Sequence, residues 1–146
     1  MKENKHLGAY GIIINENKIL LIRKVSGPYD GKLDLPGGTI EFAETPKQTL
    51  KRELLEEVGI EVKECELFDT DSVIIEWKYK DDMIKTHHIG IFYKILSYEN
   101  EIKKEIKIDS INDDSMGAEF YNINELTKNQ LSEIAILQLK KLGYEL

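Results

Sequence analysis

Three glutamates lie close together in the segment from residue 37 to residue 60. They are Glu53, Glu56 and Glu57, and a helix would place this i, i+3, i+4 set in one row. Like charges at this spacing destabilise an isolated helix by roughly a few tenths of a kcal/mol per pair. In proteins, Mg²⁺ takes oxygen ligands and often bridges one or two carboxylates to the phosphates of a substrate. The row therefore indicates either a solvated acidic face or a site for divalent-metal chemistry on phosphates.

The residues around the row bear on both alternatives. Arg52 can pair with Glu56 one turn away and partly neutralise a solvated face. Gly37 and Gly38, however, lie just before the helix, and glycine lets the backbone approach a ligand closely. A backbone carbonyl there is a further candidate oxygen ligand. The glycines shift the balance towards a metal site.

The helix that must carry these residues has clear boundaries. Thr45 is a good N-cap, and Gln48 three residues later completes a capping-box pattern. Gly59 suits the position just after a helix end. The sequence therefore predicts a helix from Pro46 to Val58. Its apolar row, which would pack on a sheet, is Leu50, Leu54 and Val58.

The rest of the chain predicts strands on both sides of this helix and a second helix at the end. Residues 9–14 and 18–23 form apolar runs separated by Asn-Glu-Asn, which predicts a hairpin. Further strands are predicted at 72–79, 87–95 and 118–123, and apolar residues between 131 and 142 predict a closing amphipathic helix. We expect one domain over residues 1–146, of the α/β (α+β) class, with a mixed sheet flanked by helices.

Composition narrows the class of partner. The net charge of −7 and the pI near 5.1 argue against binding a nucleic-acid polymer, which needs a basic surface. They do not argue against a small phosphorylated ligand bound beside local cations. The first residues lack the apolar run of a signal peptide, and no long apolar stretch predicts a membrane span. We expect a cytoplasmic protein without a membrane partner.

The glutamate segment resembles the signature of the Nudix hydrolases. That signature is Gly, five residues, Glu, seven residues, Arg-Glu, an aliphatic residue, any residue, Glu-Glu, any residue, Gly and an aliphatic residue. The matching residues are Gly38, Glu44, Arg52, Glu53, Leu54, Glu56, Glu57, Gly59 and Ile60. A match at every specified position is far more specific than a lone glycine pattern. The order of the predicted elements is also similar to the Nudix α/β/α sandwich.

The resemblance implies a role for each matched residue. Glu53, Glu56 and Glu57 would bind Mg²⁺ or Mn²⁺, with the carbonyl of Gly38 as a further ligand. Arg52, with Glu44, would orient the glutamates through charge-assisted hydrogen bonds. The implied reaction is metal-dependent hydrolysis of a diphosphate bond in a nucleoside diphosphate linked to another group.

The general base is left open by the sequence. Glu56 or Glu57 of the helix is the first choice, because some family members use a helix glutamate. Other members use an acid from a later loop, and the candidates here are Asp113, Asp114 and Glu119. A solvated loop acid is the simpler interpretation of these three. The phosphorus attacked and the oligomeric state are not predicted.

Substrate choice in this family is determined outside the signature. The chain is most similar to the MutT-like branch, which implies a nucleoside triphosphate, possibly oxidised, as substrate and a monophosphate and pyrophosphate as products. Arg23 is then expected to contact a substrate phosphate. Two residues depart from that branch: Ser132 stands where an asparagine is expected, and Leu35 where an aromatic residue is expected. Preference for an oxidised guanine therefore stays a hypothesis.

Other functions stay open. Nudix hydrolases of ADP-ribose tend to carry a proline after the signature. No proline of this chain lies beyond Pro46, so the resemblance disfavours that substrate. Nudix hydrolases of diadenosine polyphosphates tend to carry a tyrosine after the signature, where this chain has Trp77 and Tyr79. This weakly suggests a dinucleoside polyphosphate substrate, although aromatic residues in strands are more often packing partners. Nucleotide sugars, a non-catalytic nucleotide sensor and a purely structural domain are the remaining alternatives. His87 and His88 are adjacent in a predicted strand and point to opposite faces, so a surface and a half-buried histidine are expected rather than a metal site.

Overall fold

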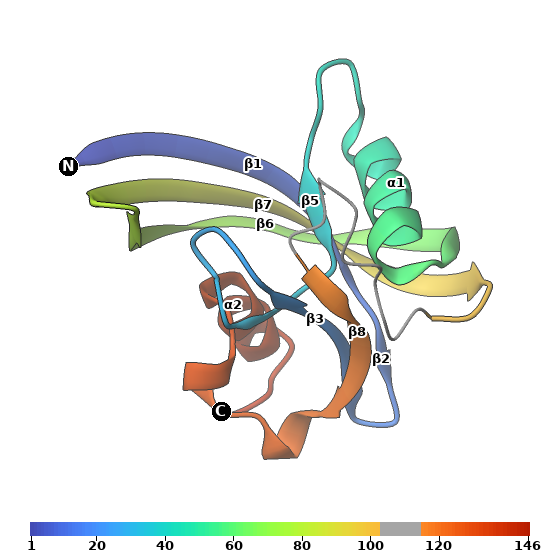
Figure 1. Cartoon of the computed structure of the whole chain (residues 1–146). Helices are drawn as coiled ribbons and strands as arrows, with labels where there is room; N and C mark the ends of the chain where they lie inside the picture. The colour runs from blue at the N-terminus through green and yellow to red at the C-terminus, as the bar shows by residue number, and fades with distance from the viewer. Residues whose placement is uncertain (103–114) are drawn as a thin grey trace.

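The computed structural model of the chain describes residues 1–102 and 115–146. Its strands are β1 (Lys2–Ile12), β2 (Ile14–Asn15), β3 (Lys18–Lys24), β4 (Leu33–Asp34), β5 (Gly37–Thr39), β6 (Glu61–Tyr79), β7 (Asp82–Glu99) and β8 (Ser115–Asn122). Its helices are α1 (Pro46–Val58), α2 (Glu133–Lys141) and the short 3₁₀ helices η1 (Ile123–Glu125) and η2 (Lys128–Gln130). Figure 1 shows the strands running between α1 and α2.

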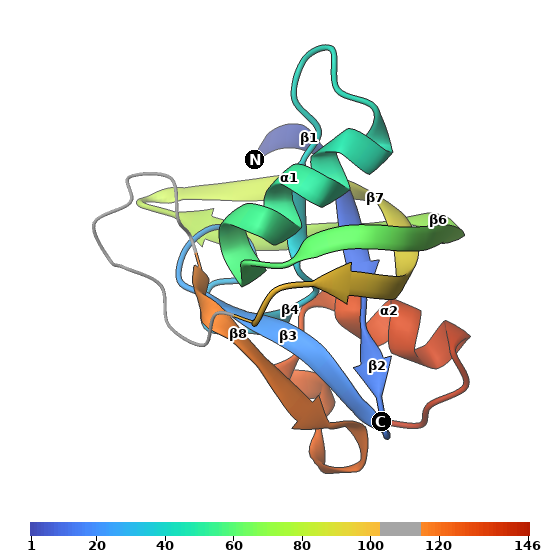
Figure 2. The ribbon, with the colours of Figure 1, turned by 90° about the vertical axis from the view of Figure 1, so that its right-hand side faces the viewer.

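The strands form two sheets. The larger sheet has the order β5-β1-β7-β6, and β1 runs parallel to β7 while β5 and β6 pair antiparallel to their neighbours. In the smaller sheet β3 pairs with β2, β4 and β8, always antiparallel. Figure 2 shows the smaller sheet below the larger one. The prediction of a mixed sheet is confirmed.

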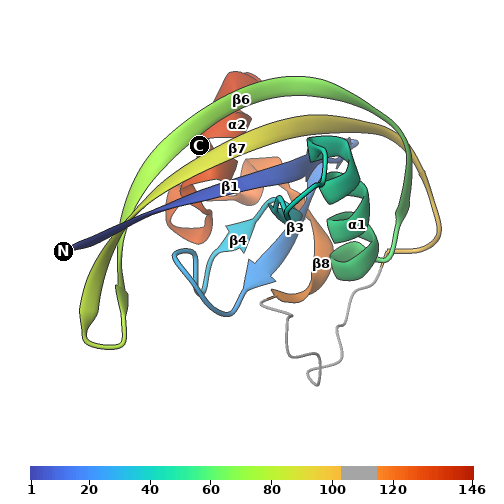
Figure 3. The same cartoon turned by 90° about the horizontal axis from the view of Figure 1, so that it is seen from above.

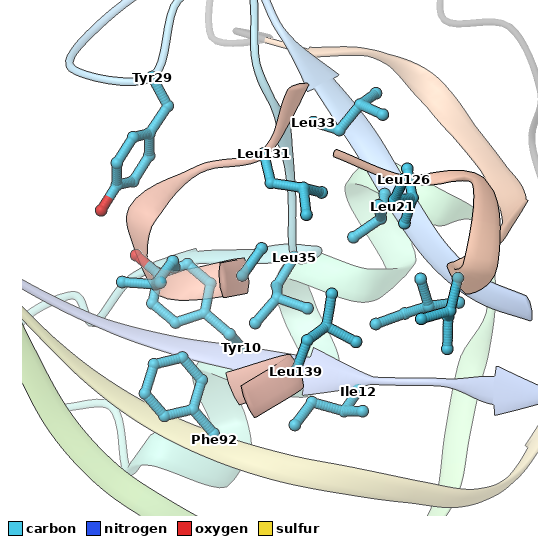
Figure 4. Packing of buried hydrophobic residues seen from close by; sticks show 14 of the residues in the cluster. Tyr10, Ile12, Leu21, Tyr29, Leu33, Leu35, Phe92, Leu126, Leu131 and Leu139 are labelled. Carbon is cyan, nitrogen blue, oxygen red and sulfur yellow. The ribbon is translucent and has the colours of Figure 1, made fainter. Parts of the chain in front are cut away.

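Each helix covers its own apolar core. Leu54 of α1 belongs to a buried cluster with Ala9 of β1, whereas Leu139 of α2 belongs to a second cluster with Tyr10 and Phe92. Successive residues of a strand point to opposite faces, so β1 contributes to both clusters. Figure 4 shows the second cluster, in which Phe92 lies beside the ring of Tyr10. The α/β/α layering is therefore as predicted.

Helix α1 begins and ends where the sequence predicts. The hydroxyl of Thr45 accepts a hydrogen bond from the Gln48 N–H, and the Gln48 side chain accepts one from the Thr45 N–H. At the other end Gly59 has a φ of +83°, and its N–H donates to the carbonyl oxygens of Leu54 and Leu55. Local capping therefore defines the element that carries the glutamates.

The predicted hairpin of residues 9–14 and 18–23 is only partly correct. Its turn is confirmed, because Glu16 and Asn17 both have positive φ values and β2 pairs with β3 across them. Residues 9–12, however, pair with β7 instead of β3. They are buried on both faces, as befits a strand inside a sheet with both faces covered.

The two strands predicted at 72–79 and 87–95 are parts of much longer ones. Strand β6 begins at Glu61 and β7 extends to Glu99, because a polar, half-exposed strand has little apolar signal in the sequence. In Figure 3 the curved β6–β7 hairpin projects with the N-terminal end of β1 beyond both helices. The predicted strand at 118–123 appears as β8, and the closing helix as α2. Neither α1 nor α2, within the described ranges, is long and apolar enough to cross a membrane.

Candidate active site

Arg52 is the centre of a network of charged hydrogen bonds beside α1. Its guanidinium donates twice to the carboxylate of Glu44, with N–O distances of 2.7 and 2.9 Å. Its Nη1 donates to Oε1 of Glu53 at 2.9 Å, and its Nη2 to the carbonyl oxygen of Thr39 at 3.2 Å. Paired bonds between a guanidinium and a carboxylate fix both groups in one geometry. Arg52 therefore holds Glu53 at a defined place beside the end of β5.

Glu44 is in turn held by its own loop and helix. Its Oε1 accepts hydrogen bonds from the Thr49 hydroxyl at 2.9 Å and from the Glu41 N–H at 3.0 Å. The guanidinium of Arg52, followed by the Glu41 N–H, lowers the pKa of Glu44 from 4.5 to about 2. The hydrogen bonds that Arg52 donates to Glu44 and to Glu53 raise the pKa of Arg52. Both groups are therefore charged at neutral pH, and the structure joins these two predicted site residues directly.

The carboxylate of Glu53 lies against Gly38. A methyl group in place of the Gly38 side-chain hydrogen would lie 2.7 Å from both Cδ and Oε1 of Glu53. The preceding residue, Gly37, has a φ of +143°, and a methyl group there would lie 2.1 Å from the carbonyl oxygen of Ala9. The two glycines therefore allow β5 to pass between β1 and the glutamate row.

The other two glutamates of the row have different surroundings. Oε1 of Glu57 accepts a hydrogen bond from the Gly37 N–H at 2.8 Å, and this residue is only 5% exposed. Glu56 is 56% exposed, with one oxygen 3.4 Å from Nη1 of Arg52. The structure thus places Glu53 and Glu57 against the Gly37–Gly38 segment, and Glu56 on the outer side of the same helix.

The side chains of the glutamate row are of the type that fits an oxygen-preferring cation. Within residues 1–102 and 115–146, no three His, Cys, Asp or Glu side chains are grouped as metal ligands. The carboxylates of Glu53, Glu56 and Glu57 accept hydrogen bonds from Arg52 and Gly37. All three are carboxylates on one helix, and Glu53 adjoins a backbone that carries no side chain. Carboxylate oxygens are the ligand type that Mg²⁺ and Mn²⁺ prefer.

A cavity of about 210 Å³ lies next to Glu53. Gly37, Gly38, Thr39 and Glu53 form part of its wall, so it adjoins the glutamate row. Further wall residues are His6, Tyr10, Lys24, Tyr29, Asp34 and His88. The cavity therefore combines the predicted site with residues from β1, β3, β4 and β7 that the sequence had not connected to it.

His88 is the most unexpected of these residues. Its Nε2 lies 2.5 Å from the hydroxyl of Tyr10, and its Nδ1 lies 2.8 Å from the hydroxyl of Tyr29. Burial, aided by the positive charges of His6 and Lys24, lowers the pKa of His88 to about 3. This histidine is 2% exposed and not half-buried as predicted. In the sequence, an even spacing from Phe92 is the signal that places His88 on the same, buried face of the strand.

His87, in contrast, lies on the other face of β7, as predicted. It lines a separate surface hollow with Ile74 and Lys85. Trp77 donates from Nε1 to the hydroxyl of Thr86 at 2.8 Å, so it is a cross-strand packing partner. Neither residue belongs to the wall of the cavity beside Glu53.

Arg23 is not brought to this cavity. It lies beside Tyr121 and Glu119 of β8, and the neighbouring Lys24 lines the cavity instead. Glu119 is exposed on β8. The other two loop acids named as candidate bases, Asp113 and Asp114, lie outside the described residues.

Ser132 and Leu35, the two departures from the MutT-like pattern, have structural roles. The hydroxyl of Ser132 caps α2 by accepting from the Ala135 N–H, and it donates to Oδ1 of Asp34 at 2.6 Å. Leu35 is fully buried in the core under α2, and its N–H donates to the same oxygen at 2.8 Å. These bonds hold Asp34, which lines the cavity, in place.

Comparisons with known proteins agree with this geometry. Residues 4–140 match the model of the NUDIX domain. The chain therefore belongs to the Nudix family, and the predicted resemblance is confirmed. The MutT NUDIX hydrolase of Burkholderia pseudomallei has a similar structure, with a TM-score of 0.75 and 19% identity over 96% of this chain and 99% of that one. This likeness confirms the fold class.

Two relatives are similar in sequence. The ADP-ribose pyrophosphatase of Methanocaldococcus jannaschii is 33% identical over 118 residues, which are 81% of this chain and 62% of that protein. The 8-oxo-dGTP diphosphatase of Proteus vulgaris is 31% identical over 105 residues, which are 71% of this chain and 87% of that protein. The chain thus spans under two thirds of the first relative and most of the second.

Proposed function

We propose that the protein hydrolyses a diphosphate bond of a nucleoside triphosphate, releasing pyrophosphate and leaving the monophosphate, with Mg²⁺ or Mn²⁺ as cofactor. The observation that carries the proposal is the position of Glu53, which Arg52 holds against Gly38 at the edge of the cavity. The name of the Proteus vulgaris relative, an 8-oxo-dGTP diphosphatase, supports a triphosphate substrate.

The residues that would hold the cation are Glu53, Glu56, Glu57 and the carbonyl of Gly38. When bound, such a cation offsets the negative charge of the diphosphate and lowers the pKa of a coordinated water. Arg52 and Glu44 keep Glu53 in place, and Lys24 in the cavity wall adds a local positive charge. The protein needs no covalent intermediate for this reaction.

Glu56 is our first candidate for the general base. Its side chain is the most exposed of the row, whereas Glu57 is buried and accepts the Gly37 N–H. A base must reach the water whose proton it takes, either directly or through one other water. Exposure therefore favours Glu56 over Glu57 as the base.

A second candidate substrate is a nucleotide sugar or ADP-ribose. The name of the Methanocaldococcus jannaschii relative, an ADP-ribose pyrophosphatase, favours it. Dinucleoside polyphosphates are a further alternative within the same chemistry. A sensor that binds a nucleotide without hydrolysis is the alternative from another class, and the presence of every acidic residue of the signature argues against it.

The experiment that tests the proposal measures Mg²⁺-dependent product release from a substrate panel. The panel contains normal and oxidised nucleoside triphosphates, ADP-ribose, nucleotide sugars and dinucleoside polyphosphates. We expect pyrophosphate from triphosphates and a loss of at least about 100-fold in the Glu56→Gln variant. Glu66→Gln, which changes an exposed glutamate of β6, is the matched control and should retain full activity. Nucleotide binding without any turnover would instead support a sensor.

A further inference from the structure

His88 holds two tyrosine hydroxyls in the wall of the cavity. Tyr10 comes from β1 and Tyr29 from the loop between β3 and β4, and their hydroxyls lie 2.5 and 2.8 Å from the two ring nitrogens of His88. In Figure 4 the side chain of Tyr29 extends from its loop towards Tyr10. Tyr10 and His88 are each 2% exposed and Tyr29 is 4% exposed. Residues far apart in the sequence are thus joined into one hydrogen-bonded unit.

This unit has one more polar proton than it has internal hydrogen bonds. Burial raises the pKa of both tyrosines, so each hydroxyl keeps its proton. His88 is neutral because its pKa is lowered to about 3, and a neutral imidazole has one N–H donor and one acceptor nitrogen. Two hydrogen bonds use two of the three protons. In either tautomer, one O–H of Tyr10 or Tyr29 remains without a partner inside the unit.

The surroundings of this spare donor favour a neutral, flat ligand. The ring of His6 stacks on that of His88 with centroids 4.6 Å apart and an angle of 10° between the planes. Asp34 and Glu53 contribute two carboxyl groups to the wall, and Lys24 contributes one amine. With Glu53 assigned to the cation, the amine of Lys24 and the carboxylate of Asp34 carry opposite charges, so the rest of the wall suits a neutral group. Pockets for whole drug-sized ligands measure roughly 300–1,000 Å³, so a cavity of 210 Å³ suits one part of a nucleotide.

We propose that Tyr10 and Tyr29, positioned by His88, select the base of the nucleotide: one of their two hydroxyls donates a hydrogen bond to a carbonyl oxygen of the base that enters the cavity. The proposal rests on the proposed function in so far as the ligand is a nucleotide. Tyr10 and Tyr29 are then specificity-determining residues, and His88 is a positioning residue that acts through them. Bases with a keto group are preferred, because an amino group in the same place leaves the spare proton without an acceptor.

Hypoxanthine and adenine make the sharpest pair of probes. Both are purines of the same shape, with a keto group in hypoxanthine where adenine has an amino group. We expect inosine monophosphate to bind roughly 10- to 100-fold more tightly than adenosine monophosphate, the range for one buried polar group left unpaired. Isothermal calorimetry with Mg²⁺ measures both affinities without requiring turnover. The matching kinetic comparison uses kcat/KM of the inosine and adenosine triphosphates.

Two variants test the residues. His88→Phe removes the anchor of both hydroxyls but keeps a ring against His6, and Tyr10→Phe/Tyr29→Phe removes both hydroxyls but keeps every ring. In each variant we expect the affinities for inosine monophosphate and adenosine monophosphate to differ by no more than about twofold. KM for the inosine triphosphate should rise about tenfold with little change in kcat, because Glu53 is untouched. Tyr79→Phe, near the exposed tip of the β6–β7 hairpin, is the control and should match wild type.

The outcomes separate this proposal from the proposed function. An inosine preference that both variants abolish supports the proposal, even if no triphosphate is hydrolysed and the proposed function fails. Equal affinity for the two monophosphates in the wild type overturns the proposal, even if triphosphates are hydrolysed. A preference that persists in the variants overturns the assigned residues. If His88→Phe does not fold, as judged by circular dichroism, the double tyrosine variant decides alone.

Discussion

Replacing Gly37 or Gly38 with alanine adds one methyl group to adjacent residues, and the structure predicts opposite consequences. At Gly37 the methyl group would lie 2.1 Å from the carbonyl oxygen of Ala9 and 2.7 Å from Cα of Tyr10. These atoms belong to the backbone of β1 and cannot move alone. The positive φ of +143° adds strain of about 1–3 kcal/mol for a residue with a side chain. We expect Gly37→Ala to lose at least about 3 kcal/mol of unfolding free energy.

At Gly38 the methyl group would meet the end of a flexible side chain instead. The atoms within 3 Å all belong to the carboxylate of Glu53, which can rotate away. The fold should therefore survive, but Glu53 would leave the place where Arg52 holds it. Changing a group that supports a metal ligand typically costs about 10- to 100-fold in metal affinity or activity. We expect that loss for Gly38→Ala with little change in stability.

Thermal unfolding and initial rates of pyrophosphate release, measured on both variants, check this contrast. A loss of about 3 kcal/mol corresponds to a decrease of roughly 10 °C in Tm for a chain of this size. Gly37→Ala should show that decrease, and Gly38→Ala should unfold within a few degrees of wild type. A stable Gly37→Ala protein would refute the steric argument for β5. A fully active Gly38→Ala protein would refute the placement of Glu53 in the site.

Other predictions concern α1 and its charged network. Thr45→Ala removes the N-cap and should cost about 1 kcal/mol in urea denaturation, whereas Thr45→Ser should cost little. Arg52→Lys keeps the charge but loses the pair of hydrogen bonds to the Glu44 carboxylate. Activity should therefore fall about 10- to 100-fold without unfolding. The pKa of Glu44 is lowered from 4.5 to about 2 on folding, so its stabilisation is present above pH 4.5 and is lost as pH falls towards 2. As the pH falls from 4.5 to about 2, the Tm of Glu44→Gln should therefore decrease less than that of wild type. An identical decrease in Tm would contradict the assignment.

Local signals explain what the sequence predicted well. The boundaries of α1 depend on Thr45, Gln48 and Gly59, which act within a few residues of each other. Because these signals define the helix, they also predict that Glu53, Glu56 and Glu57 lie in one row on it. Motif, cap and apolar row all belong to one continuous segment, so no long-range pairing had to be known.

The cavity could not be predicted because it depends on pairing between distant strands. Tyr10 meets His88 only because β1 runs parallel to β7, with His6 opposite His88. The sequences of β1 and β7 do not indicate this register, because each apolar strand could pair with several others. Arg23 shows the same limit on a smaller scale. A shift of one residue reverses the face of a side chain, and the pairing of β3 with β8 shifts between Ile22 and Lys24.

Pyrophosphate release from nucleoside triphosphates by wild type and Glu53→Gln, with and without Mg²⁺, tests most directly whether Glu53 and Gly38 form a hydrolytic site. We predict release by the wild type that requires Mg²⁺ or Mn²⁺ and stops when the metal is chelated. Release by Glu53→Gln should be at least about 100-fold slower at saturating metal, with the fold intact. Equal rates for the two proteins, or release that continues without metal, would contradict the proposed site.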